Sequence, residues 1–317
     1  MCEEHRENNG HKNHQPRRLM DIHMIHRTVE QMASKGLSEI IPSTMGEPLL
    51  YKHFDEIIKI SSRFGIKINL TTNGTWPKLG PQKWAEILCP VSSDIKISWN
   101  GARAATQEAI MRGSEFSQRL DDLYTFVKVR DDIAASGGNH CRLTFQCTFM
   151  EINLDELLDI IRLAADIGIE RVKGHHLWVH SPEMQHLDMR RSIESRSRWN
   201  RIVERCQDRV KHLPEGKNVI LENFVPLPIE NAEIPPHWTC PFLGKEAWVN
   251  HEGRFNPCCA PDVQRQELGM FGHVADDGGM EAIWEGEKYS HLLYNHMKYS
   301  VCRRCNMRRP PAEVCGS

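Results

Sequence analysis

Apolar residues recur at helical spacing and then in short β-rich runs, and this alternation continues through the first two thirds of the chain. Ile22, Ile25 and Val29 predict a helix that ends at Gly36, and a short apolar run over residues 38–42 predicts a buried strand. A helix followed directly by a buried strand is the repeating unit of an α/β protein.

The same unit recurs along the chain. Further helices are predicted around Phe54 and Trp84 and over 103–135, and Asn153 with Glu156 predicts a capped amphipathic helix after them. The β-rich runs cover residues 66–72, 93–99, 141–150 and 169–179. Units of this length imply a parallel sheet, either doubly wound or a full or partial barrel, with ligands bound beyond the carboxyl ends of the strands.

Prolines mark a boundary in the last third. A polar helix is predicted near residues 190–211, and the segment after it is rich in proline and has little helical periodicity. These features divide the chain into a core over 1–212, a linker over 213–236 and a small cysteine-rich domain over 237–317.

Charge and hydropathy exclude two classes of partner. The 317 residues carry 40 Lys and Arg against 42 Asp and Glu, a net charge of −2, so no general field attracts nucleic acid or anionic lipid. Mean hydropathy is −0.51, and no run approaches the roughly 18 apolar residues of a membrane span. The first residues lack a secretory signal, so we expect a cytoplasmic protein without nucleic-acid or membrane partners.

Cysteine is the most informative residue type. The chain has 11 cysteines and is too large to need disulfides, which in a reducing compartment favours metal ligation by some of them. The C-x-x-C pair Cys302 and Cys305 is joined in the last third by Cys240 and Cys258, and thiolate sets of this kind select zinc or an iron–sulfur cluster. We expect Cys259 to be a packed thiol, because neighbouring residues rarely reach one metal.

The remaining cysteines have a different expected role. Those within predicted strands and helices are expected to be ordinary buried thiols: Cys89, Cys141, Cys147 and Cys206. Cys315 lies close to the end of the sequence and is not assigned to the metal site.

The cysteine-rich domain resembles a known extension. The order of CPFLGKEAWVNHEGRFNPCCAP, LGMFGHV, EAIW and CRRC is similar to the SPASM domain, or its shorter twitch form, of radical S-adenosylmethionine (SAM) enzymes. A complete SPASM domain has further cysteines and two auxiliary clusters. The resemblance here implies one auxiliary 4Fe-4S cluster on Cys240, Cys258, Cys302 and Cys305.

The first half carries motifs that resemble the cofactor-binding segments of the same family. TMGEPLL is similar to the motif that meets the methionine amino group, LTTNGT to the next strand end, KISWNGA to a ribose-contacting strand, and AIMRGSEF to the segment whose arginine pairs with the cofactor carboxylate. The implied SAM-binding residues are Gly46, Glu47, Pro48, Thr72, Asn73, Ser98, Asn100 and Arg112. The implied fold is a partial (β/α)6 barrel lacking its first strand, plus the SPASM/twitch domain.

One part of the family pattern is incomplete. The catalytic cluster is held by a C-x3-C-x-Φ-C loop, and Met1-Cys2 resembles only its final Φ-C. Cys2 is therefore the implied ligand, and we expect that the chain is truncated at its N-terminus and inactive as given.

The resemblance implies a radical SAM oxidoreductase or modifying enzyme. It would cleave SAM reductively for hydrogen abstraction, acting on an alcohol or, as the second possibility, a peptide, with flavodoxin or ferredoxin as electron donor. The rival hypothesis is a non-catalytic partial barrel with a structural zinc site. No catalytic residue is identified.

Histidines are a further source of candidate site residues. His175 and His176, at a predicted strand end, are candidates for a substrate pocket, whereas His5, His11 and His14 are expected to be solvated.

Overall fold

The computed structural model describes residues 19–42, 46–179, 181–230, 234–260 and 262–311. These residues form two compact units. Of the described residues, those within 39–54 and 61–230 belong to the first unit, and those within 19–38, 55–60 and 234–311 belong to the second. In this division residues 19–38 and 55–60 group with the C-terminal region, and residues 213–230 group with the first unit. The predicted boundaries at 212 and 237 stay a prediction.

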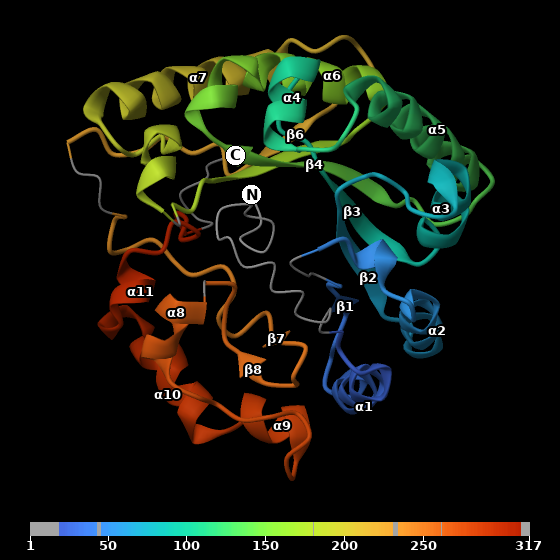
Figure 1. Ribbon diagram of the computed structural model, residues 1–317, viewed down its shortest axis with the longest axis vertical. Coiled ribbons are helices and arrows are strands. Elements are labelled where there is room, and N and C mark those ends of the chain that lie inside the picture. Colours follow the sequence, from blue (N-terminus) through green and yellow to red (C-terminus); the bar gives the residue numbers. More distant parts are fainter. Residues whose placement is uncertain (1–18, 43–45, 180, 231–233, 261, 312–317) are drawn as a thin grey trace, which may run out of the picture. The chain divides into compact units, whose positions relative to one another are not determined.

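The first unit is built on a six-stranded parallel sheet (Figure 1). Its strands lie side by side in chain order: β1 (Glu39–Ile40), β2 (Lys67–Thr72), β3 (Ser92–Ser98), β4 (Arg142–Phe149), β5 (Arg171–His176) and β6 (Ile220–Glu222). The predicted α/β class with a partial barrel of parallel strands is confirmed. β6 was missed, since it is only three residues long and falls in the segment predicted as a linker.

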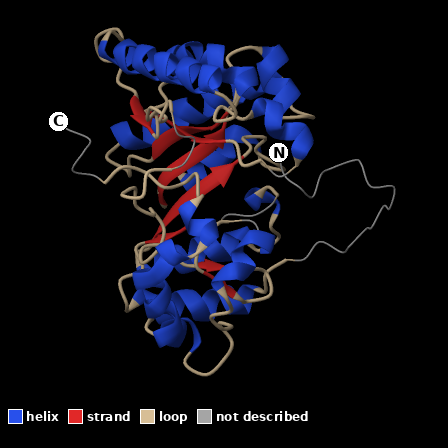
Figure 2. Cartoon of the chain, turned by 90° about the vertical axis from the view of Figure 1, so that its left-hand side faces the viewer, coloured by secondary structure: helices blue, strands red, loops and turns tan. Residues whose placement is uncertain are grey.

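Helices connect the strands. They are α2 (Phe54–Phe64), α3 (Gly80–Leu88), α4 (Ala104–Ile110), α5 (Phe116–Ala135), α6 (Leu157–Ile167) and α7 (Ile193–Lys211), with 3-10 turns η2 (Pro48–Leu50), η3 (Glu151–Glu156) and η4 (Pro182–Leu187). Helices α3, α5, α6 and α7 lie along one side of the sheet, and Figure 2 shows the same layering from a second direction. Asn153 does not cap α6; it lies inside η3, where its side chain accepts from the Met150 amide at 3.0 Å.

The two faces of the sheet differ in chemistry because side chains alternate along each strand. The helix-covered face is apolar: Ile95 and Ile97 on β3 and Leu143 and Phe145 on β4 are fully buried. Gly174 on β5 leaves room for the ring of Phe149, which any Cβ at this position would contact. This face is the core of the unit.

The opposite face carries a polar network across four strands. The carboxylate of Asp94 on β3 is buried and pairs with Arg171 on β5, and it accepts from the Thr144 hydroxyl on β4 at 2.8 Å. Arg171 also pairs with Glu222 on β6 at 2.8 Å. The pairing therefore fixes the relative positions of β3 to β6.

The second unit has few strands. It contains α1 (Ile22–Ala33), the antiparallel pair β7 (Trp248–Val249) and β8 (Phe255–Asn256), and the helical segments α8 (Asp262–Arg265), η5 (Gln266–Leu268), α9 (Gly279–Trp284), α10 (Glu287–Asn295), η6 (His296–Lys298) and α11 (Ser300–Arg303).

Helix α1 packs against α9 within this unit. The Gln31 side chain donates to the Gly278 carbonyl at 2.7 Å and accepts from the Met280 amide at 2.9 Å, so it caps the first turn of α9. Arg27 donates to the carbonyl of Val274 at 3.2 Å, and Lys35 pairs with Glu281. The first helix and the C-terminal region thus form one packed structure.

Cysteine burial agrees with most of the predictions. Cys89, Cys141, Cys147 and Cys206 are buried, as expected. Cys259 is exposed, so its prediction as a packed thiol was wrong.

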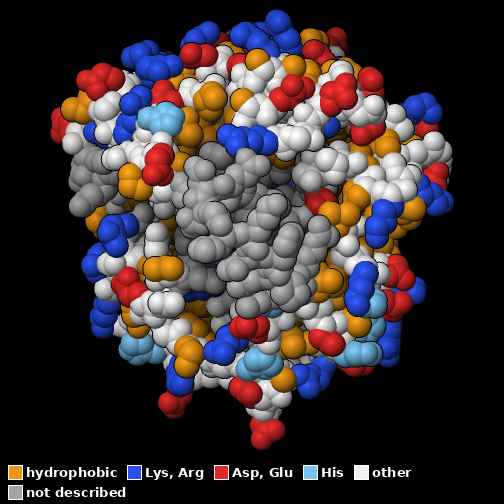
Figure 3. All heavy atoms as spheres, viewed as in Figure 1, with side chains coloured by type: hydrophobic (Ala, Val, Ile, Leu, Met, Phe, Trp, Pro, Cys, Tyr) orange, Lys and Arg blue, Asp and Glu red, His pale blue; other side chains and the backbone are white. Residues whose placement is uncertain are grey.

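The surface is mixed in charge. On the face shown in Figure 3, lysine and arginine side chains are interspersed with aspartate and glutamate. In the described part of the chain, no helix has the length and apolar character needed to cross a membrane.

Replacing Asp94 should destabilise the first unit strongly. In Asp94→Asn, the buried Arg171 keeps only its pair with the partly exposed Glu222, so we expect the free energy of unfolding to fall by about 3 kcal/mol. Urea denaturation would measure the free energy of unfolding. Asp132→Asn, which removes an exposed pair with Lys128, should change it by less than about 0.5 kcal/mol. Equal effects of the two changes would contradict the role of Asp94.

Candidate functional site

Glu47 joins the turn after β1 to the carboxyl end of β2. It lies at the N-cap of η2, where its Oε1 accepts from the Leu49 amide at 3.2 Å and from the Thr72 hydroxyl at 2.8 Å. Its Oε2 accepts from the Asn73 amide at 2.7 Å. The structure thus brings three predicted cofactor-binding residues together, with Pro48 buried beside them.

Burial raises the pKa of Glu47, and these hydrogen bonds act in the opposite direction. Both carboxylate oxygens already accept from the protein, so the carboxylate has a structural role whether or not it meets a ligand. A Cβ on Gly46 would meet no atom within 4 Å.

Arg119 links the carboxyl ends of β2 and β3. Its guanidinium donates to the carbonyl of Ser98 at 2.9 Å and to that of Asn73, and it lies over the ring of Trp99 at 5.1 Å. Burial lowers the pKa of Arg119 to about 10. This residue was missed from the sequence, since a single arginine inside a polar helix carries no distinguishing signal.

Asn100 lies just beyond β3, and some of its polar atoms already form hydrogen bonds within the protein. Its side-chain oxygen accepts from the Thr148 amide at 2.8 Å, and its backbone carbonyl accepts from Asn153 at 2.9 Å. The side-chain nitrogen, Nδ2, is the atom of Asn100 that remains to face a ligand. Ser98 lies one strand position inward of Trp99, on the polar face of the sheet.

Arg112 does not join this group of strand ends through a described contact. It is exposed on the loop between α4 and α5. The arginine that contacts the strand ends is Arg119, seven positions further along. The predicted role of Arg112 therefore remains a prediction.

The two adjacent histidines of β5 have different surroundings. His175 lies on the polar face, where its Nδ1 and the Gln146 Nε2 are 3.2 Å apart. Burial, with Lys173 nearby, lowers the pKa of His175 to about 4, so its ring is neutral near pH 7. If Gln146 donates to Nδ1, the hydrogen is on Nε2, and the ring offers a donor to a ligand.

His176 is on the opposite face, among aromatic rings. Its ring centroid lies 4.6 Å from that of Trp199 and 5.6 Å from that of Phe149, and burial lowers its pKa to about 3. It packs in the core, so its prediction as a pocket residue was wrong. A shift of one residue along a strand reverses the face, which the sequence alone could not settle for adjacent histidines.

Four cysteines of the second unit influence one another electrostatically. The pKa of Cys302 is raised to about 12, first by burial and then by Cys258, Cys240 and Cys305. The pKa of Cys305 is raised to about 11 by burial, with contributions from Cys240 and Cys258. Burial also raises the pKa of Cys258. The chain thus gathers thiols from three separate segments.

Other predicted residues lie outside the described part of the chain. They are Cys2, His5, His11, His14 and Cys315.

Comparison with known proteins identifies the family. Residues 2–191 match the Radical SAM superfamily, and residues 240–306 match an iron-sulfur cluster-binding domain, SPASM. The chain belongs to the radical SAM superfamily. No curated protein matches the chain.

Solved structures share the fold of this radical SAM protein. Streptococcus suis SuiB bound to S-adenosylmethionine is 14% identical with a TM-score of 0.62, covering 94% of this chain and 67% of SuiB. SuiB bound to the precursor peptide SuiA is 14% identical with a TM-score of 0.57, and the match covers 90% of this chain and 64% of SuiB. The structure of anSMEcpe with AdoMet and the Kp18Cys peptide is 13% identical with a TM-score of 0.58, covering 91% of this chain and 80% of that one. The chain therefore spans about two thirds of SuiB.

The cofactors of this radical SAM protein are 4Fe-4S clusters and S-adenosylmethionine. The donor set of the second unit fits a cluster, since four thiols that influence one another electrostatically lie there. The polar strand ends of the first unit fit a cofactor with amino, carboxylate and hydroxyl groups, because they offer both donors and acceptors.

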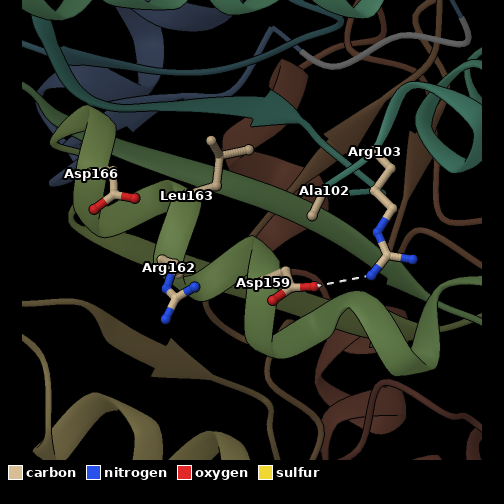
Figure 4. Close-up of a pocket in the computed structure, with 6 residues that line it drawn as sticks. All are labelled: Ala102, Arg103, Asp159, Arg162, Leu163 and Asp166. Carbon is tan, nitrogen blue, oxygen red and sulfur yellow. Dashed lines mark hydrogen bonds and ion pairs between the residues drawn. The ribbon is translucent and has the colours of Figure 1, made fainter.

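A groove elsewhere on the first unit is lined by a different set of residues (Figure 4). Its volume is about 240 Å³, and its wall includes Arg103 and Asp159, which pair at 3.5 Å, together with Arg162 and Asp166 on α6. None of the predicted site residues lines it, so it is not part of the candidate site.

The pKa values of the histidines predict how stability depends on pH. His176 has an ordinary pKa of 6.5 when unfolded and about 3 when folded, so between these values the unfolded state binds more protons. Its contribution to stability is complete above pH 6.5 and is lost as the pH falls, by about 1.4 kcal/mol per pH unit.

Replacement by phenylalanine should remove that contribution. We expect the unfolding free energy of His176→Phe, measured with urea from pH 7.5 to 5.5, to fall less steeply than that of the unmodified chain. His186→Phe, at an exposed position, should keep the original slope. An unchanged slope in His176→Phe would show that this histidine is not buried in its neutral form.

Proposed function

We propose that this protein uses the radical SAM reaction to modify a peptide. When bound, a reduced 4Fe-4S cluster supplies the electron that cleaves S-adenosylmethionine into methionine and a 5′-deoxyadenosyl radical, which takes a hydrogen atom from the substrate. The residues of this chain bind and orient the cofactor and substrate and exclude water.

The arrangement of the strand ends carries the cofactor part of the proposal. Glu47 and Arg119 tie the carboxyl ends of β2 and β3 together, and ligands of parallel α/β proteins bind beyond such ends. Thr72, Asn73, Ser98 and Asn100 are at or just beyond these ends and are proposed to contact the cofactor. Arg112, on the following loop, is proposed to meet the methionine carboxylate.

The second unit is proposed to hold one auxiliary 4Fe-4S cluster on Cys240, Cys258, Cys302 and Cys305. In the described residues, no three His, Cys, Asp or Glu side chains are arranged to hold a single metal ion. The match of residues 240–306 to an iron-sulfur cluster-binding domain favours the cluster over zinc. Four thiolates saturate such a cluster, which favours electron transfer as its role.

A peptide substrate is favoured over a small alcohol by fold likeness. SuiB and anSMEcpe, whose structures contain peptides, share the fold of this chain over at least 90% of its length. The polar face beside the strand ends adds a neutral His175 and Gln146, which can donate to and accept from amide groups. A flavodoxin or ferredoxin is the proposed electron donor.

The role of Arg112 can be tested by cofactor binding. Arg112→Ala should weaken S-adenosylmethionine binding by about tenfold or more, because it removes a charge-assisted hydrogen bond. Equilibrium dialysis with a reconstituted chain extended to carry the complete C-x3-C-x-Φ-C loop would measure the dissociation constant. Arg103→Ala, an exposed arginine at the other end of α4, is the matched control and should leave binding unchanged. Equal affinities in both variants would remove Arg112 from the site. Glu47→Gln is a poorer test, because a glutamine cannot accept the Asn73 amide and the Thr72 hydroxyl as the carboxylate does.

The substrate class can be tested by hydrogen transfer. An anaerobically reconstituted form of the protein, extended to carry the complete C-x3-C-x-Φ-C loop, would be given S-adenosylmethionine, dithionite and deuterated short peptides encoded beside its gene, with deuterated cyclic polyols as the comparison. We expect deuterium in 5′-deoxyadenosine, and a mass change, with a peptide. Deuterium transfer from a polyol alone would indicate an alcohol dehydrogenase and contradict the peptide proposal. Formation of no 5′-deoxyadenosine above a cluster-free control would contradict SAM cleavage by this chain.

A further inference from the structure

Arg308, three residues after Cys305, is almost completely buried, with 3% of its surface exposed. Its guanidinium donates four hydrogen bonds to backbone carbonyls. Nε donates to Trp238 at 2.8 Å, Nη1 to Arg303 at 3.0 Å, and Nη2 to Pro235 and Pro236 at 2.7 Å each. A buried guanidinium with this many protein acceptors has a fixed position.

The four carbonyls come from two segments that carry cluster cysteines. Residues 235–238 lead directly into Cys240, and Arg303 lies between Cys302 and Cys305. The next residue continues the connection, since Arg309 and Thr239 exchange two backbone hydrogen bonds of 2.8 and 3.1 Å. Arg308 and its neighbour therefore hold the segment of Cys240 against the C-x-x-C pair.

The charge of Arg308 acts on the same thiols. It interacts electrostatically with Cys305, Cys302 and Cys240. A cation buried beside an anionic cluster stabilises the reduced, more negative state over the oxidised one, which raises the reduction potential. A neutral residue with the same packing would leave the potential more negative.

We propose that Arg308 is the positioning residue of the auxiliary cluster: it holds Cys240 at the C-x-x-C pair through its forked hydrogen bonds, and its charge raises the reduction potential of the cluster. This inference rests on the proposed assignment of Cys240, Cys258, Cys302 and Cys305 to one cluster.

Variants of the reconstituted full chain test the proposal. Arg308→Gln removes the charge and most of the four guanidinium hydrogen bonds, called the fork here. Arg308→Lys keeps the charge but cannot form the fork. Arg304→Gln is the matched control, because Arg304 lies inside the C-x-x-C pair but is exposed and donates to Ser300. Cys305→Ala defines how much iron and acid-labile sulfide belong to the auxiliary cluster. The readouts are iron loss to a chelator and the midpoint potential from a redox titration followed by electron paramagnetic resonance.

Arg308→Gln should lose auxiliary iron to the chelator at about tenfold or more lower chelator concentration, as changes beside metal ligands commonly cause. The cluster that remains should have a more negative potential. Arg308→Lys should lose iron almost as readily but keep a potential close to that of the unmodified chain, and Arg304→Gln should change neither.

Three results would overturn the inference. If Arg308→Gln matches Arg304→Gln in both readouts, Arg308 has no role at the cluster. If it destabilises the apo chain but the potential of its cluster is unchanged, the role is structural only. If Arg308→Lys keeps its iron as the unmodified chain does, the fork is not needed, and this result stands even where Arg308→Gln fails to fold. Full iron retention in Cys305→Ala, or zinc without sulfide, would instead contradict the ligand assignment on which the inference rests.

Discussion

The buried ion pair between Asp94 and Arg171 is the constraint on which the first unit depends. A curved sheet with a polar inner face cannot rely on apolar packing on that side, so its buried charges must be paired within the sheet itself. Asp94, Thr144, Arg171 and Glu222 meet this requirement across β3, β4, β5 and β6. The same contacts fix strand register, because a shift of one residue would send each charge into the apolar face.

Register at the base of the strands determines what lies at their carboxyl ends. With β3 and β4 paired from Asp94 with Arg142 to Ser98 with Gln146, and β4 with β5 from Thr144 with Arg171 to Phe149 with His176, the polar ends fall at one edge. Glu47 and Arg119 then close the edge over β2 and β3. Glu47 accepts from two backbone amides and the Thr72 hydroxyl, and Arg119 donates to two backbone carbonyls, so these contacts place the loops without using the side chains of Ser98 or His175. Those side chains are left for a ligand.

Much of this arrangement is readable from the sequence, and the exceptions have physical causes. The alternation of helices and strands, the parallel sheet and the four cysteines all follow from local patterns and spacing. The strand β6 is too short to show periodicity, and its position depends on pairing with β5. His176 and His175 are indistinguishable in sequence because both follow the same strand, and only the pleat separates them. The roles of Arg119 and Arg308 could not be predicted for another reason. Their partners are mainly backbone carbonyls of segments distant in sequence, and every residue has such a carbonyl, so no residue type indicates the contact.

The second unit has much less regular secondary structure than the first. It has one two-residue strand pair and short helices, so little regular backbone pairing holds its loops in place. Side chains hold these loops instead, since Gln31 caps α9 from α1, and Arg308 collects the carbonyls of two cysteine-bearing segments. The segment before Cys240 is positioned by this guanidinium and by the bridge between Thr239 and Arg309, so its order depends on these few contacts and on whatever the thiols bind. The folding of this unit and the binding of its cluster should therefore be strongly linked, as in other small domains whose ligands come from irregular segments. The first unit differs, since its ion-paired sheet positions the strand ends before any cofactor arrives.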